Sequence, residues 1–236
     1  MNEPQVTHDK PPFSTALMVL ICLSIYGLMS GFMFGVAGRI DLPWVWATMS
    51  VFSTAHMTCL IVIRRDSGLI RERLKPGPGA PLWDRILLSL LAVVFLANML
   101  VTPLDVGRFH WSDKLPFVLH MMGLVATAIG MAITTWAMAV NTFFSKVVRI
   151  QSERGHRVVS SGPYRFVRHP GYVGITLMWI GFHLAIGSWL GVAVAAIVVI
   201  LLVYRTAKED QLLIRELDGY EEYANNVRWR LVPRIW

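Results

Sequence analysis

The sequence predicts an all-α membrane protein, a polytopic helical bundle of four long spans followed by a C-terminal helical hairpin. Of its 236 residues, 55% are hydrophobic and only 16% are charged, whereas a soluble domain carries about 25% charged residues. The apolar residues are collected into long runs, which are typical of helices that cross a bilayer. The basic residues flank these runs in small groups, as expected for loops at a membrane surface.

Four of the apolar runs are long enough to span a membrane. A helix needs about 20 residues to cross a hydrocarbon core of about 30 Å. The first run follows a polar N-terminal stretch and is too long for the core of a cleavable signal peptide, so we expect it to be a retained span. The four runs cover residues 13–37, 42–63, 86–104 and 115–140.

The fifth run, residues 173–204, is predicted to be a helical hairpin with its turn near Gly187. As one straight helix it would be about 48 Å long, which exceeds the membrane core, and it is too short for two full spans. With the N-terminus in the cytoplasm, the hairpin leaves only three of the 22 lysines and arginines outside: Arg39, Arg108 and Lys114. This distribution agrees with the positive-inside tendency. The hairpin therefore places residues 141–172 and the C-terminal tail on the same, cytoplasmic face.

The organisation is predicted to be one integrated domain, with four spans in residues 1–140 and a loop, hairpin and tail helices in residues 141–236. The net charge of +7 is explained by membrane topology, so nucleic acid is not an expected partner. Cys22 and Cys59 lie within apolar runs, and no HxxxH or HxxE spacing occurs. Neither a disulfide framework nor a metal site is therefore predicted.

The polar segment before the hairpin, residues 141–172, is rich in Arg, Gly and Pro. Pro163 and Pro170 fix their own φ and disfavour helix in the residue before them. Gly162 and Gly171 allow tight turns or the close approach of a ligand. Non-helical backbone at membrane depth is tolerated only where protein covers it or where it lines a cavity. We therefore expect a rigid loop that holds a polar ligand beneath the tail.

The tail is predicted to begin as a helix near Arg205, with an apolar face formed by Leu213, Leu217 and Tyr220. Arg205 and Glu209 are four residues apart and share one helix face. An arginine can bind a carboxylate through two hydrogen bonds, and an acid can accept hydrogen bonds from hydroxyls or an amine.

Each candidate also has a simpler interpretation. Arg168 and Arg205 would serve as anchors at the membrane surface, or Arg205 and Glu209 would form an ordinary surface pair. His156 and His169 would be loop histidines that bond to the backbone.

The combination of GPYRFVRHPGY at 162–172, an apolar hairpin, RxxxED at 205–210 and an Arg-rich tail resembles one superfamily of membrane enzymes. These are the isoprenylcysteine carboxyl methyltransferases and phospholipid methyltransferases. The resemblance covers residues 141–236 and implies that S-adenosylmethionine is enclosed between the loop and the tail helix. The residues that it implies for cofactor binding are Gln151, His156, Arg157, Val158, Val159, Tyr164, His169, Pro170, Gly171, Tyr172, Glu209 and Asp210.

The resemblance also implies roles for the charged side chains. Arg205 matches the substrate-facing arginine of the family, with Arg168 as a second substrate contact, and Arg205 and Glu209 are the implied catalytic residues. Asp210 stands where the family has a second glutamate, so its side chain is shorter by one methylene than the one that contacts the cofactor in the family.

The sequence therefore predicts an S-adenosylmethionine-dependent methyltransferase, a monomer whose partners are the bilayer and a lipidic or amphiphilic acceptor. The acceptor is expected to resemble a prenylcysteine-type carboxylate, with a phospholipid amine or a small thiol as the alternatives. A non-catalytic protein that binds lipids or a partner is the alternative from another class. A membrane reductase would need a nicotinamide site, and no GxGxxG opens a helix in this sequence.

Overall fold

The computed structural model describes residues 14–64, 66–112 and 114–236, which form helices and loops without a strand. Five helices are long and apolar enough to cross a membrane, and a sixth apolar helix, α6 (Pro170–Ile186), is shorter. The five are α1 (Thr15–Ala37), α2 (Pro43–Ile63), α4 (Leu82–Pro103), α5 (Phe117–Val140) and α7 (Trp189–Glu216). The predicted fold class, a polytopic helical membrane bundle, is confirmed.

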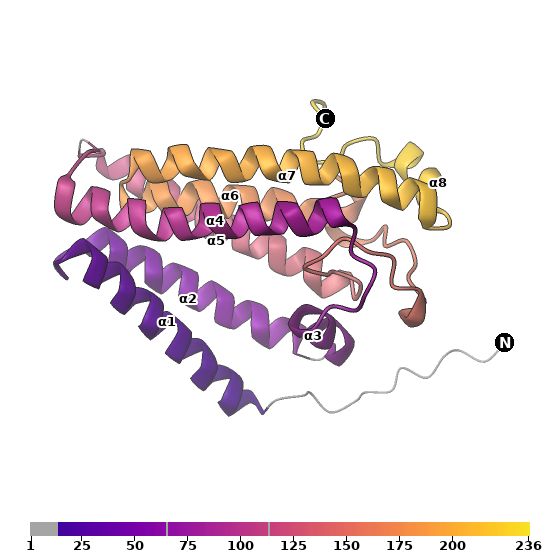
Figure 1. Ribbon diagram of the computed structural model, residues 1–236, viewed down its shortest axis with the longest axis horizontal. Coiled ribbons are helices and arrows are strands. Elements are labelled where there is room, and N and C mark those ends of the chain that lie inside the picture. The colour runs from indigo at the N-terminus through magenta and orange to yellow at the C-terminus, as the bar shows by residue number, and fades with distance from the viewer. Residues whose placement is uncertain (1–13, 65, 113) are drawn as a thin grey trace.

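The connections between the helices gather at the two ends of the bundle (Figure 1). One end holds the α1–α2 turn, the π-helix η1 (Leu104–Phe109) and the α6–α7 turn. The opposite end holds the short helix α3 (Ser67–Leu74), the loop that leads from α5 to α6, and α8 (Tyr220–Asn226). The loop and the tail thus lie at the same end of the bundle, as predicted, while the N-terminal stretch that was assigned to the cytoplasm lies outside the described residues.

The predicted hairpin is formed by α6 and α7, but its two legs differ in length. Gly187 ends α6 with a φ of 97°, and the Ser188 side chain caps α7 by accepting a hydrogen bond from the Gly191 amide. Helix α7 then continues for 28 residues, about 42 Å, which exceeds a hydrocarbon core of about 30 Å. The expected tail helix is therefore the last part of this membrane helix, and it extends beyond the apolar core.

Close contact between α5 and α6 fixes both ends of the loop that joins them. A Cβ atom on Gly130 would lie 2.4 Å from the Met178 nitrogen and 2.5 Å from the Gly174 carbonyl oxygen. A Cβ atom on Gly123 would lie 2.3 Å from the Ala185 nitrogen. Small residues allow membrane helices to approach backbone to backbone in this way. The loop therefore starts and ends on a tightly packed helix pair.

The segment between the second and third spans contains a short helix that was not predicted. In this helix, α3, the Asp66 carboxylate accepts a hydrogen bond from the Leu69 amide at 2.8 Å. The third span, predicted to begin at residue 86, begins at Leu82 directly after Pro81. As a result Asp84 lies in the first turn of α4 and is fully buried.

Candidate functional site

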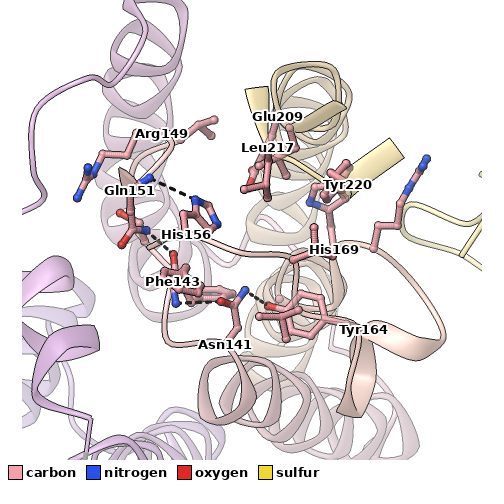
Figure 2. Close-up of a pocket in the computed structure, with 18 of the residues that line it drawn as sticks. Asn141, Phe143, Arg149, Gln151, His156, Tyr164, His169, Glu209, Leu217 and Tyr220 are labelled. Carbon is pink, nitrogen blue, oxygen red and sulfur yellow. Dashed lines mark hydrogen bonds between the residues drawn. The ribbon is translucent and has the colours of Figure 1, made fainter. Parts of the chain in front are cut away.

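A pocket lies at the end of the bundle where the α5–α6 loop meets α7 and α8 (Figure 2). Its lining comes from the loop, from α6, from α7 and from α8, and part of its space is open to solvent. Figure 2 shows Phe143, Gln151 and His156 on the loop side, while Glu209 and Leu217 approach from α7. All but three of the predicted site residues line it: Gln151, His156, Arg157, Val158, Val159, Tyr164, Arg168, His169, Gly171, Tyr172 and Glu209.

The loop side of the pocket is held by hydrogen bonds within the loop. The Gln151 side chain is almost fully buried and donates through Nε2 to the Phe143 carbonyl oxygen at 2.6 Å. The Gln151 amide donates to Nδ1 of His156 at 3.2 Å, and the His156 ring packs against the Phe143 ring with centroids 4.6 Å apart. Burial and, to a lesser extent, the nearby Arg149 and Arg154 guanidinium groups together lower the pKa of His156 to about 4. The imidazole is therefore neutral at pH 7, as its acceptor role at Nδ1 requires.

Glu209 provides the negative charge of the pocket. Among the described residues that line it, Glu209 is the one carboxylate. The Tyr172 hydroxyl donates a hydrogen bond to Glu209 Oε2, which orients the carboxylate. Such a group can accept hydrogen bonds from ligand hydroxyls or stabilise a ligand cation.

Asp210, the neighbour of Glu209, does not line the pocket. It is fully buried and joins the loop, α7, α8 and the tail. Its carboxylate accepts hydrogen bonds from Tyr220 Oη and Arg230 Nε, both at 2.9 Å, and lies 3.1 Å from Arg168 Nη2 and 3.3 Å from His169 Nε2. These contacts hold together the segments that surround the pocket, and they occupy the carboxylate that the resemblance assigned to the cofactor. Pro170, the first residue of α6, also lies outside the lining.

Arg205 lies behind the pocket wall and its guanidinium is already paired. Its Nε donates to Asp84 Oδ1 at 2.9 Å, and its Nη2 donates to the Lys146 carbonyl oxygen at 2.7 Å. The Arg205 Cζ atom lies 5.6 Å from the centroid of the Tyr172 ring, which does line the pocket. Arg205 therefore does not line the pocket itself, but it packs against Tyr172, which does.

Several lining residues were not predicted. Leu213, Leu217 and Tyr220 were assigned only to an apolar helix face, and they form the α7–α8 side of the pocket. Asn141 lies at the end of α5, where its Oδ1 accepts from the Phe143 amide at 2.9 Å and its Nδ2 lies 3.0 Å from the Tyr164 hydroxyl. The periodic spacing of the first three was visible in the sequence, whereas no motif marks Asn141.

Among the described residues, no three His, Cys, Asp or Glu side chains come together in a way that could hold an ion.

The helices define an integral membrane protein, and a pocket lies at one end of its bundle. Residues 118–217 match the family described as phospholipid methyltransferase. This segment covers nearly all of α5, the whole loop between α5 and α6, α6 and α7.

Curated relatives point to the same superfamily. The chain is 30% identical over 109 residues to the "Probable protein-S-isoprenylcysteine O-methyltransferase" of Oryza sativa, in both the indica and japonica subspecies. That match covers 45% of this chain and 57% of the rice protein. A "Protein-S-isoprenylcysteine O-methyltransferase" of Schizosaccharomyces pombe is 29% identical over 86 residues, 36% of each chain. The matched part therefore spans little more than half of the rice proteins.

These similarities confirm the predicted resemblance to the isoprenylcysteine carboxyl methyltransferase and phospholipid methyltransferase superfamily. The family match falls on the C-terminal part of the chain, where the pocket lies. The first three spans and α3 lie outside it.

Proposed function

We propose that this protein is an S-adenosylmethionine-dependent methyltransferase that acts on a lipidic or amphiphilic acceptor at the membrane face. The observation that carries the proposal is the pocket itself. Residues from the loop, from α6 and from α7 that the superfamily resemblance implies for cofactor binding converge on one pocket.

The chemistry of the lining fits this cofactor. Val158, Val159 and Leu217 offer apolar surface to a flat base, and the Glu209 carboxylate can accept hydrogen bonds from hydroxyl or ammonium groups. When bound, the cofactor supplies a methyl group already activated by a positively charged sulfur. The chain then has to orient donor and acceptor and exclude water, and it needs no nucleophile or metal of its own.

The position of the pocket suits two ligands of different polarity. Helix α7 is about 12 Å longer than the membrane core, and its last part forms the pocket wall. A water-soluble cofactor would enter from the cytoplasm, which is the side that we propose for this end of the bundle and for the tail. The acceptor would enter from the bilayer.

The acceptor that we favour is a prenylcysteine-type carboxylate, because the rice and yeast relatives carry that acceptor in their names. A phospholipid amine and a small thiol are the alternatives. With an amine acceptor, Glu209 would be the candidate to remove a proton, because it is the carboxylate that lines the pocket.

Cofactor binding tests the proposal through Glu209. Purified protein is titrated calorimetrically with S-adenosylhomocysteine, the demethylated product. Glu209→Gln should weaken binding about tenfold or more, because a hydrogen bond to a charged group contributes about 1.5–3 kcal/mol. Glu216→Gln is the matched control, since Glu216 is exposed on the same helix and does not line the pocket.

The outcome separates the enzyme from a non-catalytic membrane protein. Binding by the wild type and by Glu216→Gln, with a loss in Glu209→Gln, supports the methyltransferase. No heat from the wild type at millimolar ligand rejects it and leaves the lipid- or partner-binding alternative.

A further inference from the structure

Asp84 is a fully buried carboxylate that lies outside the segment matched to the family. It sits in the first turn of α4, and its two oxygens reach two other parts of the chain. Oδ1 accepts from Arg205 Nε on α7 at 2.9 Å, and Oδ2 accepts from the Val148 amide in the loop at 2.8 Å. One side chain of the N-terminal half therefore joins a membrane helix to the pocket-forming loop.

Arg205 completes this connection from the other side. Its Nη2 donates to the Lys146 carbonyl oxygen at 2.7 Å. The Asp84–Arg205 pair thus binds the backbone of residues 146–148 at two points: Arg205 donates to the Lys146 carbonyl oxygen, and Asp84 accepts from the Val148 amide. Val147 and Val148 line the pocket, so the segment that the pair holds is part of the pocket wall.

A second carboxylate from the N-terminal half holds the flanking residues. Glu72 of α3 accepts from Ser145 Oγ at 2.8 Å and from Arg149 Nε and Nη2 at 3.0 and 2.7 Å. Ser145 and Arg149 also line the pocket. Residues 145–149 are therefore fixed at both ends by Glu72 and in the middle by the Asp84–Arg205 pair.

The burial of the pair determines what Arg205 can do. Arg205 is 6% exposed and Asp84 is 0% exposed. Two paired charges are tolerated in such surroundings, but removing one partner leaves the other buried without compensation. An acceptor carboxylate that took Arg205 for itself would leave Asp84 in that state. The geometry therefore favours an Arg205 that stays paired with Asp84 over an Arg205 that leaves Asp84 to bind an acceptor carboxylate.

We propose that Asp84 is a positioning residue of the methyl-transfer site, acting through Arg205 and the Val148 amide to hold residues 146–148 against α7 as the cofactor pocket wall. The proposal rests on the proposed function, because it takes the pocket ligand to be S-adenosylmethionine. It assigns Arg205 to cofactor affinity and not to capture of the acceptor carboxylate.

A double-mutant cycle on ligand affinity tests the pairing. S-adenosylhomocysteine is titrated into the wild type, Asp84→Asn, Arg205→Gln and the double variant. Each single change should weaken binding at least fivefold, and the double variant should bind no more weakly than the weaker single variant, because either change releases the same segment. Asp105→Asn is the matched control. Asp105 is equally buried and hydrogen-bonded to Ser112 and Ser188 at the opposite end of the bundle, so its loss should lower the thermal midpoint and leave the affinity unchanged.

Arg205→Lys keeps the test decisive if a neutral variant fails to fold. Lysine preserves the charge opposite Asp84 but lacks the planar fork that reaches both Asp84 and Lys146. We expect Arg205→Lys to bind S-adenosylhomocysteine more weakly than the wild type. In a methyl-transfer assay, its KM for the acceptor should rise by no larger factor than its Kd for S-adenosylhomocysteine. A rise in acceptor KM with unchanged ligand affinity would overturn the proposal, as would additive effects in the cycle. A wild type that does not bind the ligand would instead reject the proposed function.

Discussion

The packing of α5 against α6 predicts a large effect from a single methyl group. Gly130→Ala places a Cβ atom 2.4 Å from the Met178 nitrogen and 2.5 Å from the Gly174 oxygen, whereas ordinary contacts lie at 3.4–4 Å. All of these neighbours are backbone atoms of a packed helix, so no side chain can move aside. The two helices must therefore separate locally by about 1 Å.

The size of the effect follows from this separation. Overpacking a tight contact costs about 1–3 kcal/mol, and a chain of this length loses about 2–4 °C in thermal midpoint per kcal/mol. We expect a fall of about 2–12 °C in detergent micelles. Because α5 and α6 hold the two ends of the pocket loop, the folded variant should also bind S-adenosylhomocysteine more weakly.

A matched glycine separates overpacking from the general effect of alanine in a helix. Gly31 lies in α1, where an added Cβ meets nothing within 4 Å. Gly31→Ala should leave stability unchanged or raise it by up to about 1 kcal/mol, because alanine favours helix. Thermal unfolding followed by tryptophan fluorescence measures both variants. Equal stability of Gly130→Ala and the wild type, or equal losses in the two variants, would refute the reasoning.

Two further predictions concern pH and topology. Burial is the main cause that lowers the pKa of His156 to about 4, below its unfolded value of about 6.5. The neutral imidazole therefore makes its whole contribution to the free energy of unfolding above pH 6.5, and this contribution declines as the pH falls towards 4. The difference in thermal midpoint between the wild type and His156→Gln should therefore shrink from pH 7.5 to pH 5, and a constant difference would contradict the role of burial. In sealed vesicles that keep the cytoplasmic face inside, a protease-sensitive tag after Trp236 should be protected from added protease. A tag in the loop between η1 and α5 should be cleaved. The reverse pattern would overturn the proposed orientation.

The parts of this fold that depend on local composition could be predicted from the sequence. A membrane span needs about 20 apolar residues in succession, so the long helices were visible as runs. The hairpin followed from the positions of the lysines and arginines, because one crossing would have left the basic tail outside. The C-terminal pocket residues followed from the superfamily resemblance, which GPYRFVRHPGY at 162–172 and RxxxED at 205–210 carry.

The connections between distant residues could not be predicted. Asp84 and Arg205 are 121 residues apart, and Glu72 and Arg149 are 77 apart, so no periodicity relates them. The third span was predicted to begin at residue 86, after Asp84, whereas α4 begins at Leu82 directly after Pro81. Arg205 consequently looked free to bind a substrate, whereas in the structure its guanidinium is paired with Asp84.

Methyl transfer itself tests the central claim most directly. Membranes that contain the wild type or Glu209→Gln are incubated with S-adenosylmethionine labelled on its methyl group and with an extract of the host's lipids. We expect label to pass into the organic-soluble fraction with the wild type and to fall at least tenfold with Glu209→Gln, while Glu216→Gln matches the wild type. Transfer that is the same with and without the protein, despite bound S-adenosylhomocysteine in calorimetry, would contradict the assignment of this pocket to a methyltransferase with a lipidic acceptor.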